Sequence, residues 1–162
     1  MASFRLPTRL LLIGRSSFDF VRTGMDMYVG RLRRYGGCEV VEIPDVKAGA
    51  KADARRVMEL EARALDKHLR TGAHVLLLDE NGARRDSVGF ARHLESLAVR
   101  GTSRVDLVIG GAYGFDPAFK ARVRDRLSLS PMTVSHQLVR LVVLEQLYRA
   151  MTILNHEPYH HA

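Results

Sequence analysis

The chain has 162 residues, of which 46% are hydrophobic and 27% are charged, and these values are typical of one soluble globular domain rather than a disordered, collagen-like or membrane protein. The single cysteine, Cys38, excludes an internal disulfide and an all-cysteine zinc site. Lys and Arg (25) outnumber Asp and Glu (18) for a net charge of +7, which favours binding to polyanions such as nucleic acid, an anionic membrane or a ribosome.

The first half of the chain predicts two strand-and-helix units. Residues 9–13, an arginine followed by four apolar residues and closed by a glycine, predict a buried strand. Ser16 is expected to cap a helix that continues to about Tyr35. Residues 38–43 predict a second strand, which ends at a proline. Apolar residues at helical spacing over 54–69 then predict a second, amphipathic helix.

The second half continues the alternation. In order, we expect a strand at 74–78, a helix around 90–97, a strand at 105–109, a helix over about 116–126, a short strand at 127–129 and a last helix over about 135–154. The strand at 74–78 is expected to stop at a turn, residues 79–82. Apolar strands that alternate with helices predict an α/β fold, with a parallel sheet covered by helices on both faces, in a single domain over 1–162.

The sequence shows no export or membrane segment. The apolar run at 10–13 is too short for the core of a signal peptide, and no stretch approaches the roughly 20 apolar residues of a transmembrane helix. We therefore expect a cytoplasmic protein.

Ligands of an open parallel sheet bind beyond the carboxyl ends of its strands. The glycine-rich residues 110–114 follow the predicted strand at 105–109 and would allow a ligand to approach the backbone closely. The alternative is a tight strand-to-helix turn without a ligand. The segment fits neither a Walker phosphate loop nor the dinucleotide fingerprint.

Residues 127–136 form a second candidate segment, because they are apolar and rich in hydroxyl groups and contain almost no charge. Such a segment could line a pocket for an adenine or a thioether. The alternative is a buried edge strand followed by a turn.

The last predicted helix is apolar around most of its circumference, which indicates either a subunit interface or a central core helix. Histidines gather late in the chain, at positions 136, 156, 160 and 161. His156 and His160 are four residues apart, but no cysteine lies near them in the sequence, so we expect no metal site.

Several short motifs occur in a fixed order. They are Val-Ile-Gly-Gly-x-x-Gly at 108–114, Leu-Ser-Leu-Ser at 127–130, Met-Thr at 132–133, His-Gln-Leu-Val-Arg at 136–140, Glu-Gln-Leu-Tyr-Arg-Ala at 145–150 and Pro-Tyr-His at 158–160. In this order they closely resemble the RlmH family, the 23S ribosomal RNA (pseudouridine-N3) methyltransferases of the SPOUT class, and the resemblance covers essentially the whole chain. The sequence departs from the family at Ser135, where a proline is usual, and at His161, where the tail is usually basic.

The resemblance implies an α/β fold tied in a C-terminal trefoil knot, with the cofactor-binding part over about 74–154. It implies a homodimer that binds S-adenosyl-L-methionine and methylates N3 of a pseudouridine in 23S rRNA on the assembled 70S ribosome, with no role for DNA or a membrane. The cofactor residues that it implies are Leu78, Gly110, Gly111, Leu129, Ser130, Pro131, Met132, Thr133 and Val134.

Five residues are candidates for positioning N3, removing its proton or stabilising the developing anion. They are His136, Tyr148, Arg149, Tyr159 and His160. One hypothesis places the tail against the cofactor of the partner subunit.

The basic residues Arg84, Arg85, Lys120, Arg122, Arg124 and Arg126 are either contacts for RNA phosphates or solvated surface. The alternative functions are a non-catalytic ribosome- or RNA-binding factor on the same fold and a transfer RNA methyltransferase of the same class.

Overall fold

The computed structural model describes residues 2–161, which form a five-stranded parallel sheet with the strand order β2-β1-β4-β3-β5. The strands are β1 (Thr8–Ile13), β2 (Cys38–Ile43), β3 (His74–Arg84), β4 (Val105–Ile109) and β5 (Arg126–Ser128). The helices are α1 (Asp19–Leu32), α2 (Ala54–His68), α3 (Ser87–Val99), α4 (Pro117–Arg122) and α5 (Leu138–Leu154), and a short 3-10 helix, η1 (Arg33–Tyr35), follows α1. The α/β class with helices on both faces is as predicted.

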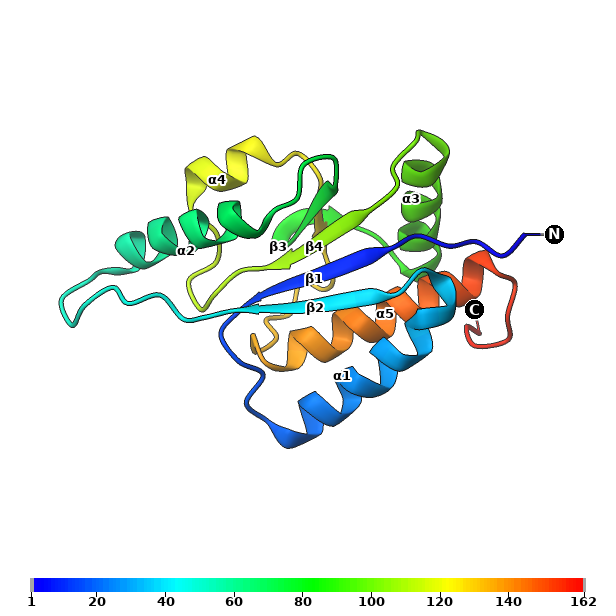
Figure 1. Cartoon of the computed structure of the whole chain (residues 1–162), viewed down its shortest axis with the longest axis horizontal. Helices are drawn as coiled ribbons and strands as arrows, with labels where there is room; N and C mark the ends of the chain where they lie inside the picture. The colour runs from blue at the N-terminus through cyan, green and yellow to red at the C-terminus, as the bar shows by residue number, and fades with distance from the viewer. Residues whose placement is uncertain (1, 162) are drawn as a thin grey trace.

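Helices cover the sheet in two layers, and Figure 1 shows α2 and α4 on one side of the strands and α1 and α5 on the other. The buried side chains of α3 join the same core as those of α1 and α5. The central strand β1 is buried along its whole length. Its side chains alternate, so that Leu10 and Leu12 join the core under α1, α3 and α5 while Leu11 and Ile13 join the core under α2 and α4. A strand buried on both faces therefore reads as a continuous apolar run.

Aspartates fix the starts of three helices. The carboxylates of Asp53, Asp86 and Asp116 accept hydrogen bonds from backbone amides in the first turns of α2, α3 and α4. The predicted cap of α1 was wrong, because α1 begins after Phe18. The Ser16 hydroxyl lies inside the protein instead, where it accepts a hydrogen bond from Arg140.

The structure corrects the end of β3. The predicted turn at 79–82 is a bulge: β3 pairs with β5 at Leu78, loses register, and resumes pairing at Ala83 and Arg84. A Cβ on Gly82 would lie 2.7 Å from the backbone between Arg126 and Leu127. Only a glycine permits this close approach.

Three other boundaries differ from the predictions. α4 ends at Arg122 rather than near 126, because Val123 is already extended. The strand β5 covers 126–128 rather than 127–129, and α5 begins at Leu138 rather than near 135. The segment between β5 and α5 is therefore longer than expected, and it spans residues 129–137.

All strands run in one direction, so the sheet has a carboxyl edge, where they end, and an amino edge, where they begin. The start of α5 bonds to residues that end β1, since Arg140 donates to the carbonyls of Ile13 and Gly14. Its end lies before β1, since the Asn155 amide bonds Phe4. Helix α5 therefore runs antiparallel to the strands, from the carboxyl edge to the amino edge.

Helix α5 packs against both α1 and α3 and buries residues such as Leu144, Leu147 and Met151. Within one chain it is the central core helix, one of the two predicted alternatives. The implied trefoil knot concerns how the chain threads between the elements, and it stays a prediction. Among residues 2–161, none of the helices combines the length and apolar character needed to cross a membrane.

Candidate active site

Three segments that the sequence analysis singled out meet at the carboxyl edge of neighbouring strands. Leu78 on β3 lies beside Ile109, the last residue of β4, and beside Leu127 of β5. The glycine segment 110–114 follows β4 directly, and the loop 129–137 follows β5. The strand order β4-β3-β5 therefore brings the predicted cofactor residues to one place on the sheet.

The glycine segment folds back on itself as a tight turn. Gly114 has φ +81 and donates its N–H to the Gly111 carbonyl at 3.1 Å. A Cβ on Gly110 would lie 3.2 Å from the Gly114 carbonyl, and one on Gly111 would lie 2.3 Å from a carboxylate oxygen of Glu61. The segment is therefore a tight turn in which Gly110 lies against backbone and Gly111 lies against the end of the Glu61 side chain.

Glu61 on α2 is a feature that the sequence analysis missed. Its side chain is buried against the glycine turn, and its Oε2 atom has no hydrogen-bond partner in the described part of the chain. Burial raises the pKa of this carboxyl group, and a hydrogen bond from the Gly111 backbone opposes the rise. A glutamate on an amphipathic helix normally faces water, so no pattern in the sequence indicated this position.

The loop 129–137 is exposed over its central part. Pro131, Met132 and Thr133 all face solvent, and Met132 is 77% exposed. The Ser130 hydroxyl accepts a hydrogen bond from the Met132 amide at 3.0 Å, which shapes the start of the loop. The predicted alternative of a buried edge strand holds only for residues 126–128, whereas residues 131–133 are exposed and accessible to a ligand.

Arg140 holds this region together from inside. Its guanidinium is 1% exposed and donates to the carbonyls of Ile13 (2.6 Å), Gly14 (3.0 Å) and His136 (3.1 Å). These acceptors are uncharged, and burial lowers the pKa of Arg140. Arg140 thus joins the end of β1 to the start of α5. Sequence reasoning included it in a motif without assigning it a role.

The structure separates the five predicted catalytic residues into two groups. His136 is exposed near the end of the loop 129–137, just before α5. The other four lie together near the far end of α5, toward the amino edge. Because α5 rises 1.5 Å per residue, His136 and Arg149 are roughly 20 Å apart along the helix axis. One chain therefore does not bring its own tail to the cofactor residues.

The tail cluster, comprising Tyr148, Arg149, Tyr159 and His160, is closely packed. The rings of Tyr148 and Tyr159 meet edge to face at 4.7 Å, and the guanidinium of Arg149 lies 4.8 Å from the centre of the Tyr159 ring. Arg149 also lies 3.2 Å from Nδ1 of His160. The cluster therefore presents a cation, an imidazole and a phenol together.

Glu145 fixes the chemistry of the tail cluster. Its Oε1 atom accepts hydrogen bonds from Arg149 at 2.6 Å and from the Tyr159 hydroxyl at 3.0 Å. Burial raises the pKa of Tyr159, and hydrogen bonding to Glu145 raises it further. Tyr159 therefore stays protonated at neutral pH and acts as a hydrogen-bond donor rather than as a base.

Ion pairs occupy several of the predicted phosphate contacts. Lys120 lies 2.9 Å from Asp79, and Arg122 lies 2.9 Å from Asp66. Arg126 lies 4.0 Å from the same Asp79 oxygen. In contrast, Arg84, Arg85 and Arg124 are exposed. Arg84, the last residue of β3, and Arg85, which follows it, lie at the carboxyl edge beside the candidate site.

Comparisons with known proteins identify the family of the chain. A family model described as "Predicted SPOUT methyltransferase" matches residues 6–160. The Ribosomal RNA large subunit methyltransferase H of Pelobacter propionicus is 50% identical over 153 residues, which are 94% of this chain and 98% of the relative. The protein of the same name from Porphyromonas gingivalis is 45% identical over 152 residues, which are 94% of this chain and 97% of the relative. 

Among solved structures, the SpoU methyltransferase AviRb from Streptomyces viridochromogenes, in complex with AdoMet, matches with a TM-score of 0.41 and 13% identity over 94% of this chain and 62% of that chain. Because the family model and these relatives extend over nearly the whole sequence, the chain belongs to the SPOUT methyltransferases, in the same family as the ribosomal RNA large subunit methyltransferase H proteins.

Proposed function

We propose that the protein transfers the methyl group of S-adenosylmethionine to N3 of a pseudouridine in 23S ribosomal RNA, on the assembled 70S ribosome. The observation that carries the proposal is the convergence of Leu78, the glycine turn and the loop 129–137 at one edge of the sheet, in a chain 50% identical over nearly its whole length to a ribosomal RNA methyltransferase.

The residues at this edge fit the cofactor. Leu78, Leu129 and Val134 offer apolar surface for an adenine and a thioether, while Ser130, Thr133 and the exposed loop backbone offer hydrogen bonds. When bound, S-adenosylmethionine supplies an activated methyl group. The protein then has to hold N3 in line with that group and exclude water.

The proton on N3 has to leave during the transfer. We assign His136 as the group that receives it, since this side chain is exposed at the end of the cofactor loop. Tyr159 stays protonated and Arg149 is already paired with Glu145. These two side chains therefore position the target nucleobase and stabilise negative charge rather than remove a proton.

A homodimer would bring the two groups of residues together. A two-fold axis across the middle of α5 places the amino end of one helix beside the carboxyl end of the other. The tail cluster of one copy then lies near the cofactor loop of its partner. Exposed apolar side chains on this side of the fold, including the stacked rings of Phe18 and Phe20, supply surface for such an interface.

The first experiment measures transfer of labelled methyl from S-adenosylmethionine to three acceptors: assembled ribosomes that lack this modification, separated large subunits and free transfer RNA. We expect label in 23S RNA only when whole ribosomes are supplied. Label in transfer RNA would favour the alternative methyltransferase. No label and no cofactor binding would favour a non-catalytic binding factor.

A mixed-dimer experiment tests the shared site. Thr133→Arg blocks the exposed cofactor loop, His160→Ala disables the tail, and each variant alone is expected to be inactive. Random mixing produces heterodimers in which one of two sites pairs an intact loop with an intact tail. Activity should return to roughly a quarter of the wild-type level. No recovery would show that each chain completes its own site.

Phosphate contacts are tested by salt dependence. Arg84→Ala and Arg85→Ala should weaken ribosome binding and reduce the slope of log affinity against log salt by about 1 each. Arg100→Ala is the matched control, because Arg100 is exposed just after α3 and, within residues 2–161, its side chain hydrogen-bonds Ser96. An equal effect of the control variant would refute a specific role for Arg84 and Arg85.

A further inference from the structure

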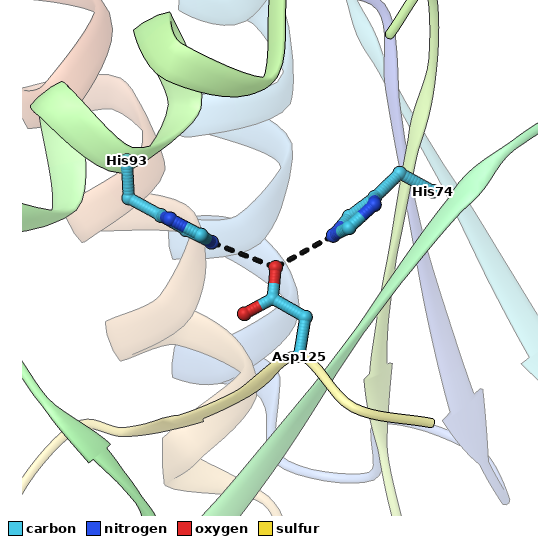
Figure 2. A group of neighbouring side chains, drawn as sticks. All are labelled: His74, His93 and Asp125. Atoms are coloured by element: carbon cyan, nitrogen blue, oxygen red, sulfur yellow. Dashed lines mark hydrogen bonds and ion pairs between the residues drawn. The ribbon is translucent and has the colours of Figure 1, made fainter. Parts of the chain in front are cut away.

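Two histidines and an aspartate meet at the amino edge of the sheet, on the opposite side from the candidate active site. His74 begins β3, His93 lies in the middle of α3, and Asp125 directly precedes β5. Figure 2 shows both imidazole rings pointing at one oxygen of Asp125. The His74 and His93 Nε2 atoms lie 2.6 Å and 2.7 Å from Asp125 Oδ2, and one ligand atom from each residue lies within 4.8 Å of the others.

The backbone around this cluster is firmly held. The His74 amide donates to the Arg104 carbonyl at 2.9 Å, and the Asp125 carbonyl accepts from the Leu77 amide at 3.0 Å. His93 is part of the regular helix α3. Three separate elements thus position the side chains before any ligand arrives, as a binding site requires.

We propose that His74, His93 and Asp125 bind one divalent transition-metal ion of the zinc class. Imidazole nitrogen and carboxylate oxygen are the ligands that zinc accepts in proteins, at about 2.0–2.2 Å. Two ligands of a tetrahedral zinc ion are then about 3.3 Å apart. Each imidazole has to move less than 1 Å from Asp125 to admit the ion, which replaces the two hydrogen bonds by metal–ligand bonds.

Burial indicates what the remaining coordination position holds. The side chains of His74, His93 and Asp125 are 29%, 12% and 17% exposed. The site is therefore mostly enclosed but open to water on one side, so water completes the coordination. Since the cluster joins β3, α3 and the chain before β5, a bound ion strengthens this corner of the fold and takes no part in methyl transfer.

The sequence could not indicate this site. Its three ligands come from positions 74, 93 and 125, and no short spacing links them. The late histidines, which have no cysteine near them, led to the expectation of no metal site. Only the parallel pairing of β3 with β5 and the packing of α3 bring these residues together.

Metal binding is tested on metal-free full-length protein titrated with Zn²⁺ by calorimetry and with Co²⁺ by visible absorption. We expect one ion per chain and a Co²⁺ spectrum typical of four- or five-coordinate sites. With Zn²⁺ at 100 times its Kd, the melting temperature should rise by roughly 5–10 °C. His93→Gln and Asp125→Asn should abolish both effects, whereas the exposed tail variant His161→Gln should change neither.

Proton NMR of the wild-type protein keeps the test independent of any folding defect in the variants. Zn²⁺ should shift the ring signals of two of the seven histidines, assigned to His74 and His93, and leave the others unchanged. Shifts confined to other histidines, absence of binding, or loss of binding in His161→Gln would overturn the proposal. Methyl transfer should be the same with and without metal. A protein that binds zinc but transfers no methyl group would therefore contradict only the proposed function.

Discussion

Replacing Arg140 by methionine should destabilise the protein through backbone carbonyls rather than through a lost ion pair. The guanidinium is 1% exposed and donates to the carbonyls of Ile13 and Gly14, which are themselves buried. Methionine has a similar length and leaves these two acceptors without a donor. Each orphaned acceptor costs about 1–3 kcal/mol.

Two such acceptors give roughly 2–6 kcal/mol, and removing the cost of burying a charge offsets part of that loss. We therefore expect the free energy of unfolding to fall by about 3 kcal/mol, and the melting temperature by roughly 6–12 °C for a chain of this length. Because Arg140 joins the end of β1 to the start of α5, cofactor affinity should fall as well.

Urea denaturation followed by far-UV circular dichroism measures the change. Arg140→Lys keeps the charge but offers fewer directed donors, so its stability should lie between those of wild type and Arg140→Met. Arg63→Met is the matched control, because Arg63 is exposed on α2. A loss below about 1 kcal/mol in Arg140→Met would show that water satisfies the two carbonyls and would refute the reasoning.

Three further predictions concern buried groups. Burial raises the pKa of Glu61, and the hydrogen bond from the Gly111 backbone only partly opposes the rise. The folded state therefore favours the neutral acid, and the stability linked to this group is lost as pH rises through the raised pKa. Glu61→Gln should therefore have a higher melting temperature than wild type at pH 8, and the difference in melting temperature should narrow toward pH 4.5. A difference that does not change with pH would contradict this. Asp106→Asn should lower the free energy of unfolding in urea by about 3–5 kcal/mol, because it breaks the buried bidentate pair with Arg9. If the double variant Arg9→Met with Asp106→Leu regains this stability, the cause is the buried Arg9 charge left without a partner. Burial raises the pKa of Cys38 to about 11, so at pH 8 about a thousandth is thiolate, and a thiol reagent should label native protein far more slowly than urea-unfolded protein; equal rates would mean that the thiol is exposed.

Periodicity predicted the elements that are buried uniformly. The strands β1 and β4 are apolar throughout because both faces are covered, and their positions were predicted to within one residue. The bulge at 79–82 in β3 escaped prediction because it depends on Gly82 lying against the backbone of β5. That contact joins residues far apart in sequence, and the local residues read as a turn in either case.

The candidate site was predictable to the extent that strand ends define it. Leu78, the glycine turn and the loop after β5 meet because their strands are neighbours. The position of the tail cluster was not predictable, since it depends on the direction of α5 relative to the strands. Arg140 was missed for a different reason: arginines on helices normally face water, and this one is enclosed by carbonyls that no sequence pattern marks.

The central place of α5 has a consequence for how the chain folds as it is synthesised. The first strand made, β1, lies between β2 and β4, and the last helix made packs against α1 and α3 over the same face. Until residues 138–154 leave the ribosome, the core that α5 shares with α1, α3 and the sheet lacks its central helix. Folding is therefore expected to be a late and collective event with many long-range contacts, and any chain cut short before α5 exposes an aggregation-prone surface.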